Sequence, residues 1–456
     1  MPNRQLFCPE RWMPTIGRVV AFTAALSTAS VTALAQAPAR VDDATLVRRI
    51  DAYVAPLAAH ELSGTLLVAR GGRVLVERSF GFANHELSVP FTPTTPTNVA
   101  SITKPLTIIV AMRLLGEKRF SLGDTVSRWL PQYVYGKRMT IEQLMNHTAG
   151  VPHRLLAEDA QEEPRTTADM VRAANAVPLL FDPGTRTSYS SGGYSLFAAV
   201  LERASGKTYD ELLQEHVVRP VSAHTIRHLD HRELLPGRAT SVVPVGTSVI
   251  NAPLRDLSFL VGAGSVYTTP RDIFAVMQGL LGGAYGASAR EALVRPTGLS
   301  WNGVTNGFRA FADWRASDSL SVLFFGNSHV GAIDLLRGDI ARLAAGETVP
   351  APVVPTVRPV ALSVAQRDRL TGDFDTGGGQ LSKVTFLSPS LMLFGDRALL
   401  ATTDSTFFST ADYAPVTFVG ATSGPATAIQ WGAGTWGKGE LGPRFARAPA
   451  AATTSP

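Results

Sequence analysis

A cluster of four prolines constrains the fold of this chain most strongly. Pro350, Pro352, Pro355 and Pro359 fall within ten residues. Proline lacks the amide proton that helices and inner strands need, so this density favours an extended linker over a packed element. The 456 residues are long enough to form two domains with separate cores. We therefore predict a folded domain on each side of the proline cluster.

The first 35 residues have the pattern of an export signal. Three arginines precede a mildly apolar run that ends in Ala33-Leu34-Ala35, a small-residue pattern typical of signal peptidase sites. Serines and threonines make the run too polar and too short for a comfortable membrane span, so we expect no stable membrane anchor. Removal of the signal also removes Cys8, the single cysteine, which fits an oxidising bacterial periplasm or the exterior. The predicted organisation is a signal peptide over residues 1–35, a large first domain over 43–346, a proline-rich linker over 347–359, a β-barrel over 360–447 and a disordered tail over 448–456.

The first domain has strand patterns near both of its ends and helical patterns between them. Gly71-Gly72 separates two β-rich runs, and a two-residue glycine turn favours a tight antiparallel hairpin. Helical or loop segments continue to about Leu281. The predicted elements are helices over residues 43–57 and 332–345 and strands over residues 64–70, 73–80, 304–312 and 319–326. This pattern predicts an α/β plus all-α domain, with an antiparallel sheet from both chain ends and a large helical insertion.

The second domain consists of short β-rich runs separated by Gly, Asp, Ser and Pro. This spacing is typical of a small antiparallel β-barrel. The runs cover residues 383–387, 391–394, 398–402, 406–409 and 416–419.

Composition argues against several classes of partner and cofactor. The formal charge is +5, from 42 basic and 37 acidic residues, and the chain has no dense basic stripe interleaved with aromatics, so we expect no nucleic-acid partner. His224, His228 and His231 lie near Asp230, but no second ligand cluster accompanies them, so we predict no metal. Neither a P-loop nor a strand followed by G-x-G-x-x-G occurs, so we expect no nucleotide cofactor.

Ser101-Ile102-Thr103-Lys104 forms an S-x-x-K tetrad at the start of a predicted helix. A spacing of three places the hydroxyl and the amine on one face, and the helix N-terminus disfavours added positive charge on the amine. A neutral amine can accept the serine proton and make Ser101 a nucleophile. The chain has only six lysines among its 42 basic residues, and arginine cannot act as a base, so lysine here indicates a group that titrates. The alternative is a solvated lysine near a helix start.

Two further segments could complete such a site. Tyr189 precedes Ser190-Ser191 and a predicted helix, and a tyrosine beside a neutral lysine can exchange protons with nucleophile and leaving group. A packed aromatic is the alternative. The segment Trp301-Asn302-Gly303-Val304 is glycine-rich where a strand begins. Such a strand can offer a backbone N–H to a developing oxyanion, opposite the N–H of Ser101, although an ordinary glycine turn would have the same sequence.

Four motifs in order carry a resemblance to a known family. They are Ser101-x-x-Lys104, Leu144-Met-Asn-His147-Thr-Ala-Gly150-Val-Pro152, Tyr189-Ser-Ser191 and Gly262-Ala-Gly264-Ser-Val-Tyr-Thr-Thr-Pro-Arg-Asp272. Residues 43–346 resemble the serine β-lactamase-related hydrolases, the class C-like branch of penicillin-recognising enzymes. The resemblance implies a β-lactamase-like fold, acylation of Ser101, proton transfer by Lys104 and Tyr189, and an oxyanion hole from the amides of Ser101 and Val304. The region after Pro359 resembles the lipocalin-like barrels often fused to such enzymes.

Two positions depart from the family pattern. Ser191 stands where the family usually has Asn, which keeps a hydrogen-bonding group of shorter reach. Trp301 stands where Lys or His usually holds a substrate carboxylate, and tryptophan cannot supply that charge; esterases of this group often carry tryptophan here. We count Ser191, Trp301, Asn302 and Gly303 as candidate substrate-binding residues, with Trp301 as a core residue as the alternative.

We predict an exported serine hydrolase that forms an acyl-enzyme and acts on small uncharged esters or amides, without a cofactor. One alternative is a β-lactamase, D-alanyl carboxypeptidase or D-aminopeptidase acting on peptide-like substrates. Another is a ligand-binding protein, with a weakly active penicillin-recognising domain and a barrel that captures a ligand. His147 belongs to a motif that we interpret as a structural turn.

Overall fold

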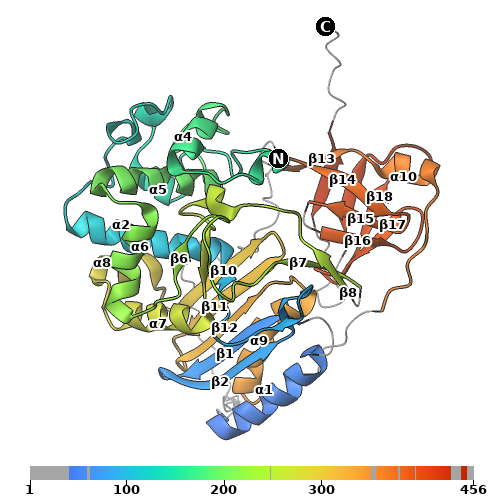
Figure 1. Cartoon of the computed structure of the whole chain (residues 1–456), viewed down its shortest axis with the longest axis horizontal. Helices are drawn as coiled ribbons and strands as arrows, with labels where there is room; N and C mark the ends of the chain where they lie inside the picture. The colour runs from blue at the N-terminus through green and yellow to red at the C-terminus, as the bar shows by residue number, and fades with distance from the viewer. Residues whose placement is uncertain are drawn as a thin grey trace, which may run out of the picture.

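The computed structural model describes residues 41–58, 62–246, 248–350, 356–377, 380–395, 397–432 and 443–448. The predicted signal peptide lies outside these residues, as do part of the predicted linker and all but the first residue of the predicted tail. Figure 1 shows a large mixed α/β part that contains a sheet and, beside it, a smaller β part formed by the C-terminal segment.

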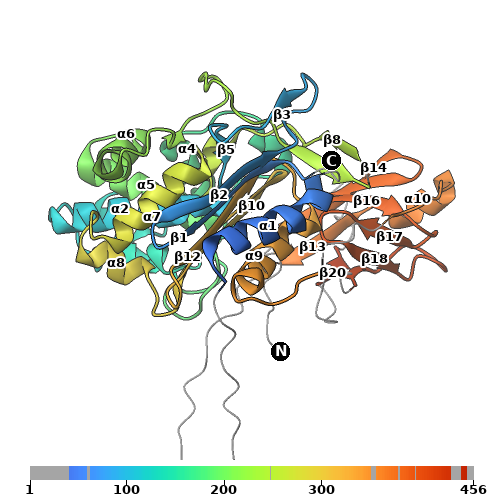
Figure 2. The ribbon, with the colours of Figure 1, turned by 90° about the horizontal axis from the view of Figure 1, so that it is seen from below.

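Helices cover both faces of the sheet and fill the insertion. The α-helices are α1 (Asp43–Ala58), α2 (Thr103–Gly116), α3 (Ile141–Met145), α4 (Thr167–Asn175), α5 (Ser191–Ser205), α6 (Tyr209–Leu213), α7 (Pro270–Leu281), α8 (Ala287–Leu293), α9 (Gly331–Ala344) and α10 (Val364–Leu370). Figure 2 shows α1 and α9 next to each other, and both contact the sheet, while α7 contacts the sheet from the other side.

The strands fall into a central sheet, short ribbons in the insertion, and a barrel. The strands before the barrel are β1 (Gly64–Arg70), β2 (Arg73–Phe80), β3 (Phe82–Asn84), β4 (Val89–Pro90), β5 (Thr97–Asn98), β6 (Arg227–His228), β7 (Val242–Val245), β8 (Ser248–Asn251), β9 (Val266–Thr268), β10 (Gly298–Thr305), β11 (Phe308–Arg315) and β12 (Leu320–Gly326). The barrel strands are β13 (Asp373–Gly377), β14 (Gln380–Ser388), β15 (Leu391–Phe394), β16 (Arg397–Ala401), β17 (Thr406–Ser409), β18 (Ala414–Val419), β19 (Ala428–Trp431) and β20 (Arg444–Arg447).

The central sheet is antiparallel and joins the two ends of the first domain. Its strand order is β10-β11-β12-β1-β2. Gly71 and Gly72 have φ angles of 57° and 81°, and this pair of left-handed residues forms the tight turn between β1 and β2. In β1, Leu67 packs into the core shared with the insertion, whereas Leu66 packs against α1 and α9 on the other face. The predicted fold class is therefore confirmed.

One predicted strand was wrong. Residues 304–312 form the end of β10, a turn and the start of β11, because Asn306 and Gly307 both have positive φ angles, 43° and 84°. An Asn-Gly pair favours a two-residue hairpin turn of this kind. The insertion, expected as helix and loop, also contains the short ribbon β5-β9-β6.

The C-terminal strands β13 to β20 form a closed antiparallel barrel, in which β13 pairs with both β14 and β20. Its interior is filled by side chains, including Phe374, Phe394, Phe407, Phe418, Trp431 and Phe445. The barrel also contacts the first domain. Tyr413 is 1% exposed and belongs to the core formed by α1, α9 and the sheet, and the amide of Gly246 donates to Thr410 Oγ1 (2.8 Å).

None of the helices in the described part of the chain is both long enough and apolar enough to cross a membrane.

Candidate active site

Ser101 lies in a strained turn directly before α2. It occupies the 3-10 turn Ala100–Ile102, in which Ala100 has a φ angle of 45°, a left-handed conformation that residues with side chains rarely adopt. Asn98 stabilises the turn, since its side chain accepts from the Ala100 amide (2.8 Å) and donates to the Gly264 carbonyl (3.2 Å). The turn leaves Ser101 partly exposed. Strain of this kind is common where a reacting group must be presented.

Lys104 lies one helical turn from Ser101 and is 5% exposed. Its Nζ is 3.3 Å from Ser101 Oγ, 3.2 Å from Ser191 Oγ and 2.9 Å from the Ala263 carbonyl oxygen. The predicted tetrad therefore brings its amine and hydroxyl into contact. The Ala263 carbonyl can only accept, so the amine directs an N–H toward it.

Tyr189 completes the group around Ser101. Its hydroxyl donates to Ser101 Oγ (2.7 Å), and Lys104 Nζ lies 4.6 Å from the centre of its ring. The next residue, Ser190, caps α5 by accepting from the Gly193 amide (2.7 Å), and Ser191 opens the helix. The cap fixes the direction of α5, so that Tyr189 and Ser191 approach Lys104 together.

Two histidines hold the Tyr189-Ser190-Ser191 segment. His147 Nδ1 accepts from the Ser190 amide and His153 Nδ1 accepts from the Ser191 amide, both at 3.2 Å. Both imidazole rings also pack on Tyr189, with centroid distances of 4.7 and 5.5 Å. His147 does form a left-handed turn, with a φ angle of 61°. No motif in the sequence points to His153 or to the contacts of both rings with the tyrosine segment.

These histidines are expected to make the folded state sensitive to acid. Burial, followed by the charge of Lys104, lowers the pKa of His147 and of His153 to about 3. Between that value and the ordinary pKa near 6.5, the unfolded chain binds more protons than the folded chain. The free energy of unfolding should therefore fall as the pH falls from 7 to 5, by about 2 kcal/mol for each imidazole.

The pH dependence can be checked by thermal melts of the wild type and of His153→Asn. Asparagine keeps an acceptor for the Ser191 amide but does not titrate, so the melting temperature of the variant should depend less on pH between 5 and 7. His224→Asn, at an exposed histidine, is the matched control. Equal pH dependence in the wild type and in His153→Asn would contradict this prediction.

Strand β10 runs against the turn that carries Ser101. A Cβ atom on Gly303 would lie 2.2 Å from the Val99 carbonyl oxygen and 3.1 Å from the Ser101 amide nitrogen. Only glycine permits this approach at position 303. The predicted third segment therefore lies beside the predicted nucleophile.

The register of the hairpin sets the direction of the Val304 amide. Thr305 and Phe308 flank the two-residue turn, and Val304 pairs with Arg309. In such a hairpin the pair next to the turn exchanges hydrogen bonds, and the following pair does not. The Val304 N–H therefore points away from β11, and β10 is one of the two edge strands of the sheet. This N–H is therefore outside the hydrogen-bond ladder of the sheet, as an oxyanion donor has to be.

Trp301 and Asn302 lie on opposite faces of β10. Trp301 shares the face of Gly303 but is 6% exposed and packs in the core of the helical side. Asn302, which we expected to bind substrate, has its side chain on the other face, where Arg309 donates to its Oδ1 atom. The alternation of side chains along a strand explains why Asn302 points away from Gly303.

The described residues contain no cluster of three or more His, Cys, Asp or Glu side chains that could hold a metal ion.

Comparison with known sequences agrees with this geometry. The Beta-lactamase family model matches residues 48–328, which is more than half of the chain. PbpX of Bacillus subtilis (strain 168), which carries the name of a penicillin-binding protein, is 25% identical over 280 residues, 58% of this chain and 70% of PbpX. Protein flp of Staphylococcus aureus (strain MW2) is 27% identical over 168 residues, 36% of this chain and only 34% of flp.

Solved structures show the same fold at low sequence identity. A penicillin-binding protein from Bacillus halodurans has a TM-score of 0.56 at 21% identity, covering 66% of this chain and 99% of that protein. EstCE1, a hydrolase with promiscuous acyltransferase activity, has a TM-score of 0.56 at 20% identity, with 67% and 99% coverage. D-amino acid amidase from Ochrobactrum anthropi SV3 has a TM-score of 0.55 at 18% identity, with 62% and 92% coverage. These structures share the fold, and the family match shows that the chain belongs to the β-lactamase family of serine hydrolases.

Proposed function

We propose that this protein hydrolyses small uncharged esters through an acyl-enzyme formed on Ser101. The observation that carries the proposal is the pair of contacts to Ser101 Oγ, from the Tyr189 hydroxyl at 2.7 Å and from Lys104 Nζ at 3.3 Å. These distances are within or close to the reach of proton transfer to a base. The partial exposure of Ser101 supports access by a substrate.

In the proposed acylation, Lys104 takes the proton of Ser101 as Oγ attacks the ester carbonyl. A neutral amine has two N–H groups, which the Ala263 carbonyl and Ser191 Oγ can accept, and its lone pair then faces Ser101. The amides of Ser101 and Val304 hold the oxyanion. The bond to the leaving alkoxide breaks, and Tyr189 supplies the proton that makes it an alcohol. Tyr189, now deprotonated, then takes a proton from water, and the resulting hydroxide attacks the acyl-enzyme. The acid is released, and Lys104 returns its proton to Ser101 Oγ.

Replacement of Tyr189 by phenylalanine should lower kcat for a p-nitrophenyl ester by about 10²-fold, because the hydroxyl that moves the proton is lost. The ring keeps its packing against His147 and His153, so the melting temperature should stay close to that of the wild type. Steady-state kinetics and a thermal melt on one preparation check both expectations. A kcat within threefold of the wild type would show that Tyr189 is only a packing residue.

Uncharged substrates are favoured because β10 offers no cation at the position of Trp301. The side chain at this position is a buried indole, which cannot pair with a substrate carboxylate. The names of PbpX and of the penicillin-binding and amidase structures keep β-lactam or D-amino-acid amide hydrolysis as the second candidate. The filled interior of the described barrel gives no support to a barrel that captures a ligand.

The test of the proposed function is a fluorophosphonate probe followed by a substrate comparison. We expect the probe to label Ser101, as located by peptide mass spectrometry, and a short-chain p-nitrophenyl ester to be turned over faster than nitrocefin or a D-amino-acid amide. An unlabelled protein would remove the enzyme proposal. Faster turnover of nitrocefin or the amide would favour the second candidate.

A further inference from the structure

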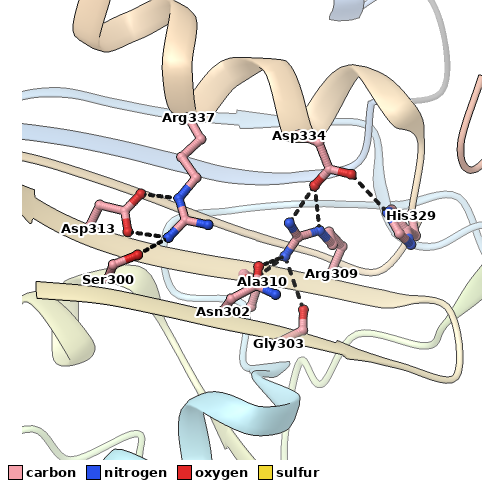
Figure 3. Close-up of polar contacts among 9 residues, drawn as sticks. All are labelled: Ser300, Asn302, Gly303, Arg309, Ala310, Asp313, His329, Asp334 and Arg337. Carbon is pink, nitrogen blue, oxygen red and sulfur yellow. Dashed lines mark hydrogen bonds and ion pairs between the residues drawn. The ribbon is translucent and has the colours of Figure 1, made fainter. Parts of the chain in front are cut away.

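Arg309 of β11 lies next to Asn302 and Gly303 of β10, on the face of the sheet that is turned toward α9 (Figure 3). It is 3% exposed. Its guanidinium donates to the Ala310 carbonyl (2.8 Å), to the Gly303 carbonyl (3.3 Å) and to Asn302 Oδ1, and it pairs with Asp334. A buried arginine therefore joins β10, β11 and α9 at the end of β10 that approaches the Ser101 turn.

The contact with the Gly303 carbonyl bears directly on the Val304 amide, because both belong to one peptide group. A peptide group is planar and trans, so its C=O and N–H point in opposite directions. The register of the hairpin turns the Gly303 carbonyl toward β11 and the Val304 N–H toward the free edge of the sheet, and Arg309 supplies a second donor that holds this orientation. A cationic donor to the carbonyl oxygen also withdraws electron density from the peptide group. This makes the Val304 N–H a stronger hydrogen-bond donor.

Asp334 balances the charge of Arg309 from the first turn of α9. Partial burial would raise the pKa of Asp334, but the charge of Arg309 and a hydrogen bond from His329 outweigh it and hold this pKa below its ordinary value. The His329 Nε2 atom lies 3.4 Å from Asp334 Oδ2. The carboxylate therefore stays ionised at neutral pH and keeps the guanidinium in place.

We infer that Arg309, held by Asp334, is a positioning residue that holds and polarises the Gly303–Val304 peptide as an oxyanion donor. This inference rests on the proposed function, because it assigns the Val304 N–H to the oxyanion of that reaction. Arg309 does not touch the substrate in this account. It acts from the back of the sheet through one peptide group.

A second arginine on the same elements provides a matched control. Arg337 of α9 pairs with Asp313 of β11 and donates to Ser300 of β10 (Figure 3). This group also joins the three elements, but it reaches β10 three residues before Gly303 and bonds a side chain instead of the backbone. Its loss should affect stability alone.

The experiment compares R309M, D334N and R337M on a p-nitrophenyl ester and on the matching thionoester. Sulfur accepts hydrogen bonds poorly, so the ratio of kcat/KM for the ester to that for the thionoester reports on the oxyanion donors. We expect R309M to lower kcat for the ester about tenfold with KM within twofold, and to lower the ratio. D334N should show smaller changes in the same direction, and R337M should keep both quantities within twofold of the wild type.

The inference is overturned if R309M keeps the wild-type ratio, or if R337M lowers the ratio as much as R309M. If R309M does not fold, R309K replaces it. Lysine keeps the charge but not the planar fork, so a lowered ratio supports the inference and an unchanged ratio overturns it. Labelling of the wild type by the fluorophosphonate probe separates the two proposals, since an unlabelled wild type removes the proposed function itself.

Discussion

Replacement of Ser101 by alanine is expected to lower ester hydrolysis by roughly 10⁴- to 10⁶-fold, the largest effect of any single change in this chain. The reason is that the acyl-enzyme cannot form without the hydroxyl, and only the oxyanion donors and substrate binding remain. The variant should fold normally, because Ser101 is partly exposed and alanine has a similar size. The measurement is kcat/KM for a p-nitrophenyl ester together with a thermal melt.

Ser121→Ala is the matched control for this change, since Ser121 is exposed and lies on a loop after α2. It should keep wild-type turnover and fluorophosphonate labelling, whereas Ser101→Ala should lose both. Hydrolysis by Ser101→Ala within tenfold of the wild type would remove Ser101 as the nucleophile. Probe labelling retained by that variant would place the reactive serine elsewhere.

The second large effect is expected at Lys104, where methionine should lower kcat by about 10³-fold. Methionine fills the same space but cannot take the Ser101 proton, and it leaves the Ala263 carbonyl without this donor. Arginine at the same position keeps a positive charge and hydrogen bonds but cannot give up its proton. Lys104→Arg should therefore be impaired about as strongly as Lys104→Met.

The control for Lys104 is Lys118→Met, at an exposed lysine just after the same helix. This change should leave kcat and the melting temperature close to the wild-type values. If Lys104→Arg retained more than about a tenth of the wild-type kcat, Lys104 would act through its charge and not as a base. Pre-steady-state kinetics would then show whether acylation or release of the acid is slowed.

The bounds of the hairpin formed by β1 and β2 could be predicted from the sequence to the residue. The predicted strands over 64–70 and 73–80 agree with β1 and β2, because Gly71-Gly72 allows few arrangements of the chain besides a tight turn. In the barrel, the runs over 391–394 and 406–409 agree with β15 and β17 for a similar reason, since polar turns separate them. Local patterns are sufficient where a turn residue marks both ends of a strand.

The hairpin of β10 and β11 shows where local patterns fail. Its alternating residues continue through Asn306-Gly307, so the alternation predicts one strand, whereas the dipeptide, which is the stronger signal, marks the turn between two strands. Strands β13, β19 and β20 were missed because their runs are short and their pairing closes the barrel between distant segments. Such pairing depends on tertiary contacts that a window of sequence does not contain.

The candidate site could be predicted where one motif carries the chemistry. The spacing of Ser101 and Lys104 was enough to place their side chains in contact, as the structure has them. The supporting residues carried no such signal. His153 and Arg309 act on backbone groups of segments far away in sequence, so only the folded chain reveals their contacts.

The pairing of β1 with β12 has a consequence for the order in which the protein can assemble. Arg70 pairs with Leu320, and Gly64 pairs with Gly326. Strand β1 can therefore pair with β12 only after most of the first domain has been synthesised. A growing polypeptide therefore presents an apolar strand with an unpaired edge during most of its synthesis. Until β12 emerges from synthesis, this open edge can pair with a strand of another copy of the chain.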